Sequence, residues 1–190
     1  MKQLSIILFL FAFSTINAQD STNLVKSPFV DFDQFEALVK EVKTHRESRL
    51  ITIEMLNEMS QQDDVIILDT RSKKMYDARH IKGAVHLNFS DFTQASLDAL
   101  LGAKDVRVII YCNNNFLDDQ IYFPTKSRSP APEIINTEMS TEEKPLTLAL
   151  NIPTYINLYG YGYKNVYELG ELISVNDPRV KLERTKVILK

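Results

Sequence analysis

Hydrophobic and polar positions alternate along this chain in two different periods. Apolar side chains spaced three to four residues apart after Pro28 predict an amphipathic helix over residues 31–47. The same spacing predicts three further helices, over residues 54–59, 92–101 and 146–159. Glycines at the ends of the last two patterns are typical helix stops.

Five short apolar runs lie between these helices and predict strands, at residues 51–53, 65–68, 85–87, 106–111 and 166–169. The second and fourth runs are apolar at nearly every position, which is typical of central strands covered on both faces. Short strands that alternate with helices predict an α/β domain with a parallel sheet. In such sheets the ligand site lies beyond the carboxyl ends of the strands.

The N-terminal residues follow the layout of a cleaved secretory signal. Lys2 precedes an apolar run over residues 4–13, and small and polar residues lead to Ala18, after which we expect cleavage. A membrane anchor is the alternative, but the run is shorter than the roughly 20 apolar residues that a spanning helix needs. We therefore expect an exported protein, periplasmic or secreted, with no stable membrane insertion after cleavage.

The composition of the chain limits its possible partners and the possible roles of its cysteine. The 190 residues carry a formal net charge of −3 without long blocks of either sign, so we expect no nucleic-acid partner. The remaining 172 residues after cleavage suit one domain, which we expect to be a monomer. Cys112 is the only cysteine, so an exported chain must bury its thiol, pair it between chains, or use it chemically.

Cys112 ends the apolar run of IIYCNNNFLD, and Asp69 ends the other central run. Both should therefore lie at the same edge of the sheet. The residues Asn113, Asn114 and Asn115 tolerate left-handed backbone angles, which favours a loop whose N–H groups surround the thiol. Such a cradle would lower the pKa of Cys112 and favour the nucleophilic thiolate. A buried packing thiol is the alternative.

Three segments resemble the rhodanese family. VIILDTRSKKMYDARHIKGAVHL contains the Asp-x-Arg of Asp69 and Arg71, VIIYC ends in Cys112, and GYGYKNVYELGE is similar to the closing helix, turn and strand. The resemblance covers roughly residues 49–175 and implies a three-layer α/β fold. Its central, mostly parallel five-stranded sheet would be covered by helices on both faces.

The resemblance implies sulfur transfer, in which Cys112 accepts a sulfur atom as a persulfide and passes it to a thiophilic acceptor. It implies a small sulfur donor such as thiosulfate or a persulfide, a thiol acceptor that a protein could provide, and neither metal nor cofactor. We expect Asp69 and Arg71 to brace the site. The substrate-binding residues would be Asn113, Asn114, Asn115, Phe116 and Leu117. A binding module that has lost turnover is the alternative.

The sequence departs from the rhodanese pattern in two places. The fifth and sixth positions after the cysteine, where rhodaneses and related phosphatases carry a basic residue, are Leu117 and Asp118. The Asp118 carboxylate would repel a phosphate group, which disfavours phosphatase activity. Residues 118–145 form an insertion, which we interpret as a surface loop. The alternative is a lid over the cysteine. The lid would obtain its aromatic wall and positive charge from Tyr122, Phe123, Lys126 and Arg128.

These patterns define four regions of the chain. They are a signal peptide at 1–18, an N-terminal extension with a helix at 19–48, a rhodanese-like domain at 49–175 with its insertion, and a C-terminal tail at 176–190. His80 and His86 have no third ligand at a suggestive spacing, so we expect no metal site.

Overall fold

A computed structural model of the chain describes residues 29–127 and 146–185. It divides the chain into two units, residues 1–31 and 32–190, and every element below belongs to the second. The expected signal peptide and residues 128–145 of the insertion lie outside the described residues. The region boundaries given above therefore stay predictions.

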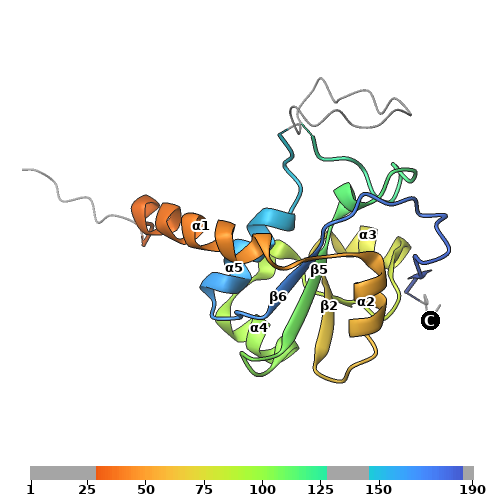
Figure 1. The fold of residues 1–190 in the computed structure, drawn as a ribbon. Helices are drawn as coiled ribbons and strands as arrows, with labels where there is room; N and C mark the ends of the chain where they lie inside the picture. The colour runs from red at the N-terminus through yellow and green to blue at the C-terminus, as the bar shows by residue number, and fades with distance from the viewer. Residues whose placement is uncertain (1–28, 128–145, 186–190) are drawn as a thin grey trace, which may run out of the picture. The chain divides into compact units, whose positions relative to one another are not determined.

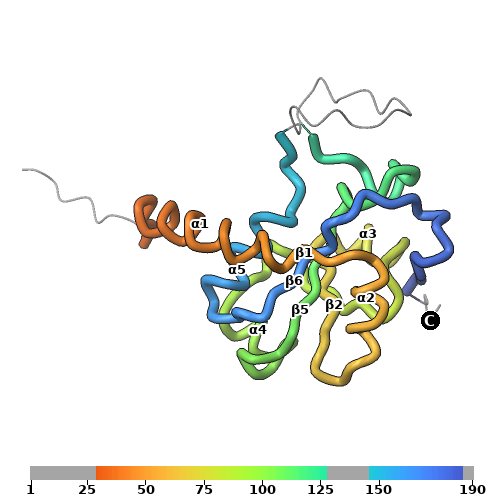
Figure 2. The backbone as a smooth tube through the Cα atoms, viewed as in Figure 1, coloured from red at the N-terminus to blue at the C-terminus, as the bar shows by residue number. Residues whose placement is uncertain are grey.

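A five-stranded sheet forms the centre of the domain (Figures 1 and 2). Its strands, in spatial order, are β1 (Leu50–Ile51), β6 (Val166–Leu169), β5 (Arg107–Tyr111), β2 (Val65–Asp69) and β4 (Val85–His86). All neighbouring strands in this sheet are parallel. The expected five-stranded parallel sheet is therefore confirmed, with the two most apolar runs paired at its centre.

Helices cover both faces of the sheet, as expected (Figure 1). One face carries α1 (Phe32–Glu47), α4 (Gln94–Leu101) and α5 (Asn151–Gly160), and the other carries α2 (Ile53–Met59) and α3 (Lys73–Ala78). Strand β5 shows why both faces must be covered. Val108 and Ile110 pack toward α4 and α5, whereas Ile109 and Tyr111 pack on the α2 side. Alternate side chains of a strand point to opposite faces of the sheet. A strand with apolar residues on both faces therefore needs a hydrophobic core on each side.

Side-chain caps explain where three of the helices begin. Thr52 and Ser72 accept hydrogen bonds from backbone N–H groups in the first turns of α2 and α3, and Thr93 forms a capping box at α4. Gly102 ends α4 with φ of 73°, a backbone angle that favours glycine. Within the described part of the chain, no helix has the length and apolar character needed to span a bilayer.

The N-terminal helix α1 packs on α5 and β6, as the helical pattern over residues 31–47 predicted. Val42 is its buried apolar contact, and Arg46 forms a two-pronged ion pair with Glu168 of β6 at 2.5 and 2.6 Å. The Glu168 side chain is 4% exposed and that of Arg46 is 26% exposed. A carboxylate buried in the sheet therefore depends on a charge that α1 provides.

Several elements differ from the sequence expectations, and helix α3 lies where no helix was expected. Ile53, assigned to a strand, is the first residue of α2, because the Thr52 side chain caps a helix there. Helix α5 begins at Asn151 rather than at residue 146. Two short strands were not expected at all: β3 (His80–Ile81) pairs antiparallel with β7 (Leu182–Glu183), which lies in the predicted tail.

The Arg46–Glu168 pair yields a stability prediction. Arg46→Ala should lower the free energy of unfolding by about 3 kcal/mol, because it leaves the buried Glu168 carboxylate unpaired. The matched control is Arg107→Ala, whose partner Asp64 is 61% exposed and stays hydrated without it. Urea unfolding followed by circular dichroism measures both variants. Equal losses of unfolding free energy in the two variants would contradict a structural role for the contact between α1 and Glu168.

Candidate functional site

The two central strands bring Asp69 and Cys112 to the same edge of the sheet. In the parallel register, Asp69 of β2 lies opposite Tyr111 of β5, and Cys112 follows Tyr111 directly. The Tyr111 hydroxyl donates a hydrogen bond of 2.5 Å to Asp69. The expected meeting of these strand ends is therefore present, and it defines the candidate site.

Asp69 and Arg71 form a buried ion pair under the site. The Arg71 guanidinium donates from Nε and Nη2 to the Asp69 carboxylate, and the two side chains are 1% and 0% exposed. Its remaining bonds reach the carbonyl oxygens of Tyr122 at 3.0 Å and Arg79 at 2.7 Å. Arg71 thus joins the end of β2 to the end of α3 and to the start of the insertion, which is a bracing arrangement.

The asparagines after Cys112 form a tight 3₁₀ turn, η2 (Asn113–Asn115). Among the described residues only glycines have positive φ, so the expectation that these asparagines adopt left-handed angles is wrong. Asn115 instead acts through its side chain. It accepts from the Cys112 N–H at 2.9 Å and donates to the carbonyl oxygens of Leu169 and Glu171. The loop is therefore held by side-chain hydrogen bonds to the end of β6.

The Cys112 thiol is buried, with the residue 2% exposed. The Leu150 N–H, just before the first turn of α5, donates to Sγ at 3.3 Å. Burial nevertheless raises the pKa of the Cys112 thiol, although the N–H groups of Leu150 and Asn113 and the charge of Arg71 act in the opposite direction. The expectation of a lowered pKa is therefore wrong, because the desolvation of the thiolate outweighs the N–H cradle.

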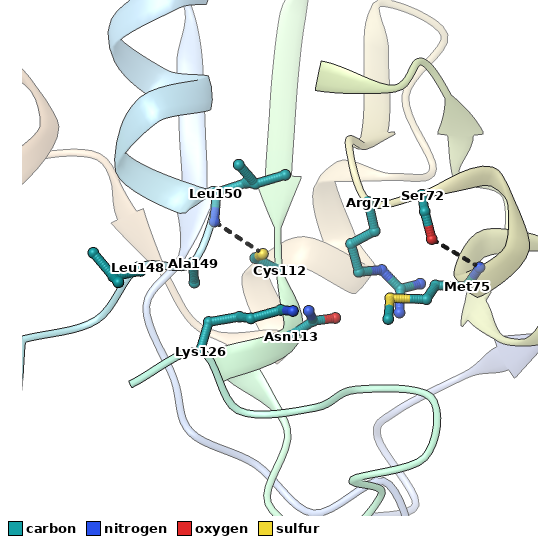
Figure 3. Close-up of a pocket in the computed structure, with 9 residues that line it drawn as sticks. All are labelled: Arg71, Ser72, Met75, Cys112, Asn113, Lys126, Leu148, Ala149 and Leu150. Atoms are coloured by element: carbon teal, nitrogen blue, oxygen red, sulfur yellow. Dashed lines mark hydrogen bonds between the residues drawn. The ribbon is translucent and has the colours of Figure 1, made fainter. Parts of the chain in front are cut away.

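A cavity of about 330 Å³ opens beside the sulfur atom (Figure 3). Its lining combines two cations, polar groups and an apolar wall: Arg71, Ser72, Met75, Cys112, Asn113, Lys126, Leu148, Ala149 and Leu150. These residues come from the end of β2, the start of α3, the Cys112 loop, the insertion and the segment before α5. The cavity size suits a small ligand.

Of the five residues expected to bind substrate, Asn113 lines this cavity. Its amide oxygen is buried and has no hydrogen-bond partner among the described residues. Asn114 accepts a hydrogen bond from the backbone N–H of Lys126, and Asn115 holds the loop. A polar group at the cavity wall is therefore left for a ligand to satisfy.

Phe116 and Leu117 are not part of the cavity lining, contrary to the sequence expectation. Phe116 is 1% exposed and packs between Tyr111 and Phe123 in the core. The Leu117 N–H donates to the carbonyl oxygen of Ile173. After the 3₁₀ turn the chain runs beside Ile173, where backbone contacts hold both residues outside the cavity lining.

The cavity residues that the sequence did not indicate are Ser72, Met75, Leu148, Ala149 and Leu150. The last three belong to a stretch that we expected to be helical. In an amphipathic helix, an apolar residue is expected to pack in the hydrophobic core. They line the cavity because α5 starts later and leaves the preceding segment non-helical beside Cys112. No spacing in the sequence could have shown this proximity.

The residues suggested for a lid have different positions. Phe123 is 0% exposed, in the core, with the Arg71 guanidinium 4.3 Å from its ring centroid. Tyr122 uses its carbonyl oxygen to bind Arg71. Lys126 lines the cavity, whereas Arg128 lies outside the described residues.

The histidines near the site make structural contacts. His80 bonds the Tyr76 carbonyl oxygen through Nδ1 at 2.6 Å and stacks on the Tyr76 ring, and His86 bonds the carbonyl oxygen of Arg71. Within residues 29–127 and 146–185, no group of three or more His, Cys, Asp or Glu side chains is placed to hold a metal ion.

Comparisons with solved structures return proteins of low sequence identity. The Alr3790 protein from Anabaena sp. is 18% identical, over 70% of this chain and 80% of that one, with a TM-score of 0.43. The BH2092 protein from Bacillus halodurans is 17% identical, over 79% and 85%, with a TM-score of 0.46. A rhodanese-like domain of the Anabaena protein is 18% identical, over 64% and 94%, with a TM-score of 0.38.

The sequence comparison is more informative than these structural likenesses. No curated protein matches the chain. The model of the rhodanese-like domain family matches residues 52–123. This segment begins at the N-cap of α2 and runs through β2 and β5 to the loop after Cys112. Residues 52–123 of the chain are therefore similar in sequence to the rhodanese-like domain family.

Proposed function

We propose that this protein is an exported sulfurtransferase or persulfide carrier in which Cys112 takes up a sulfur atom and passes it on. The observation that carries the proposal is the position of the Cys112 Sγ. It faces a cavity at the carboxyl ends of β2 and β5, receives the Leu150 N–H, and shares the cavity with Lys126. A nucleophile, hydrogen-bond donors and a cation are thus directed at one small space.

The proposed reaction has two steps, sulfur uptake by Cys112 and sulfur transfer to an acceptor. The Cys112 thiolate attacks the outer sulfur of a donor R–S–S⁻, so that an S–S bond forms at Cys112 and the donor S–S bond breaks. The products are Cys112–S–S⁻ and R–S⁻. With thiosulfate as donor the leaving group is sulfite. An acceptor thiolate then attacks the outer sulfur of Cys112–S–S⁻, leaves as the new persulfide, and restores the Cys112 thiolate.

The burial of Cys112 affects the free thiol and the loaded persulfide differently. Sγ lies under the protein surface, where desolvation favours the neutral thiol. In the persulfide the negative charge resides on the outer sulfur, roughly 2 Å farther along the S–S bond and inside the cavity. The same burial that keeps the resting thiol neutral therefore protects the inner sulfur, while the outer one lies among polar groups.

Other residues support this chemistry by holding its geometry. The Asp69–Arg71 pair braces the strand ends, and Asn115 fixes the loop after Cys112. The unpaired amide oxygen of Asn113 is an acceptor for an N–H or S–H group of the ligand. The apolar wall formed by Met75 and Leu148 suits the organic part of a small thiol persulfide, or a segment of a partner protein.

A second candidate function is a binding module that keeps the fold without sulfur turnover. The observation that favours it is the raised pKa of Cys112, since a neutral thiol is a weak nucleophile at pH 7. In this case the cavity would hold a ligand or a partner segment without forming a covalent bond.

Sulfur loading distinguishes the two candidates. The reduced full chain, incubated with glutathione persulfide or thiosulfate, should gain about 32 Da, the mass of one sulfur atom, and dithiothreitol should remove it. Intact-mass spectrometry measures the gain. Because Cys112 is the only cysteine, Cys112→Ser is the matched control and should gain nothing. Absence of the adduct with both donors would favour the binding module.

The raised pKa predicts the pH dependence of the thiol. Iodoacetamide should alkylate folded Cys112 with a midpoint above the ordinary thiol value of about 8.5, because burial disfavours the thiolate. In guanidinium the midpoint should return to the ordinary value. By linkage, the burial contributes stability that is complete below the unfolded pKa and is lost as the pH rises through the folded one. A folded midpoint at or below the unfolded midpoint would contradict this assignment.

A further inference from the structure

We propose that Lys126 is a specificity-determining residue that recognises the negative charge of the species reacting at Cys112. The identity of that species as a sulfur donor rests on the function proposed above. The recognition itself rests on the arrangement of charges around the cavity, which is independent of sulfur transfer.

Two cationic side chains line the cavity, and their charges are not equivalent. Arg71 is bound to the buried Asp69 carboxylate, and its remaining hydrogen bonds reach two carbonyl oxygens. Its charge is therefore largely cancelled within the protein. Lys126 has no carboxylate within ion-pair distance among the described residues. It is the cation whose charge is left for a ligand.

The acidic residues that follow the Cys112 loop do not neutralise Lys126. Asp119 pairs with Arg79 at 2.6 Å, and Asp118 accepts a hydrogen bond from Ser174. Both carboxylates are therefore used in other contacts. Among the described residues, the charges at the cavity are therefore those of the Asp69–Arg71 pair, which carries little net charge, and of the Lys126 ammonium group.

The backbone of Lys126 is held in place from two sides. Its N–H donates to the Asn114 side chain at 2.7 Å, which ties it to the loop after Cys112. Its carbonyl oxygen accepts from the Leu148 N–H at 2.5 Å, and Ser127 pairs with Thr147 next to this bond. Lys126 is thus attached both to the Cys112 loop and to the segment before α5.

The Lys126 side chain extends from this anchored backbone across the cavity toward Asn113 (Figure 3). An anion bound beside Sγ would therefore meet the ammonium group of Lys126 beside the Asn113 side chain. Lys126 follows the part of the chain that matches the rhodanese-like family, residues 52–123. The match thus assigns it no role, and its contribution is a feature of this chain's insertion.

Lys126 is exposed, so solvent and salt screen its charge. The expected effect is consequently moderate, about fivefold in rate for an anionic reagent at low salt, as for exposed charge pairs. It should also shrink as the ionic strength rises, because the Debye length falls from about 10 Å at 0.1 M to about 3 Å at 1 M.

Two alkylating reagents of nearly equal shape test this directly. Iodoacetate is anionic and iodoacetamide is neutral, and each forms an S–C bond with the Cys112 thiolate while iodide leaves. The measured quantity is the ratio of their second-order rate constants on the full chain. Lys126→Gln should lower the iodoacetate to iodoacetamide ratio about fivefold at low salt. Lys126→Arg should restore it, because the charge is kept.

Lys40→Gln is the matched control. Lys40 lies on α1 in an exposed pair with Glu36, so this variant changes the net charge equally without touching the cavity. An unchanged ratio in Lys126→Gln, an equal fall in Lys40→Gln, or a lack of rescue by arginine would overturn the proposal. Failure of sulfur loading would not affect this ratio, so the two proposals fail separately.

Discussion

The buried ion pair between Asp69 and Arg71 is the interaction on which the rest of the site depends. Both side chains are almost fully buried, so neither charge could remain there without the other. Asp69 also accepts from Tyr111 at the end of the neighbouring strand, and Arg71 binds the carbonyl oxygen of Tyr122. One pair thus fixes two strand ends and the start of the insertion relative to each other. The position of Cys112, one residue beyond Tyr111, follows from it.

This arrangement places opposing influences on one sulfur atom. The loop and the approach to α5 direct N–H groups at the thiol, which favours a negative charge. The same packing removes water from Sγ, which disfavours it, and desolvation is the larger effect. In the proposed function, this burial keeps the resting thiol neutral, and the charge of the persulfide lies farther out in the cavity. Lys126 lines this cavity and lies after the residues that the family match covers.

Much of the fold could be predicted because the physical reasons are local or periodic. The five strands and the helix α1 follow from apolar spacing alone. The start of α5 could not be predicted, since Leu146 and Leu148 continue the apolar pattern but are exposed and non-helical. The pairing of β3 with β7 could not be predicted either, because it joins residues about a hundred positions apart and no local pattern shows such a contact.

The sequence by itself determined that Asp69 and Cys112 end two buried parallel strands, and therefore that they share an edge of the sheet. Tertiary structure decided which neighbours face the sulfur. It put Phe116 in the core and brought Leu150 and Lys126 to the cavity, from segments that the sequence could not place. It also decided the direction of the thiol pKa, because desolvation depends on how many atoms from distant parts of the chain surround a group, and no local pattern encodes that number.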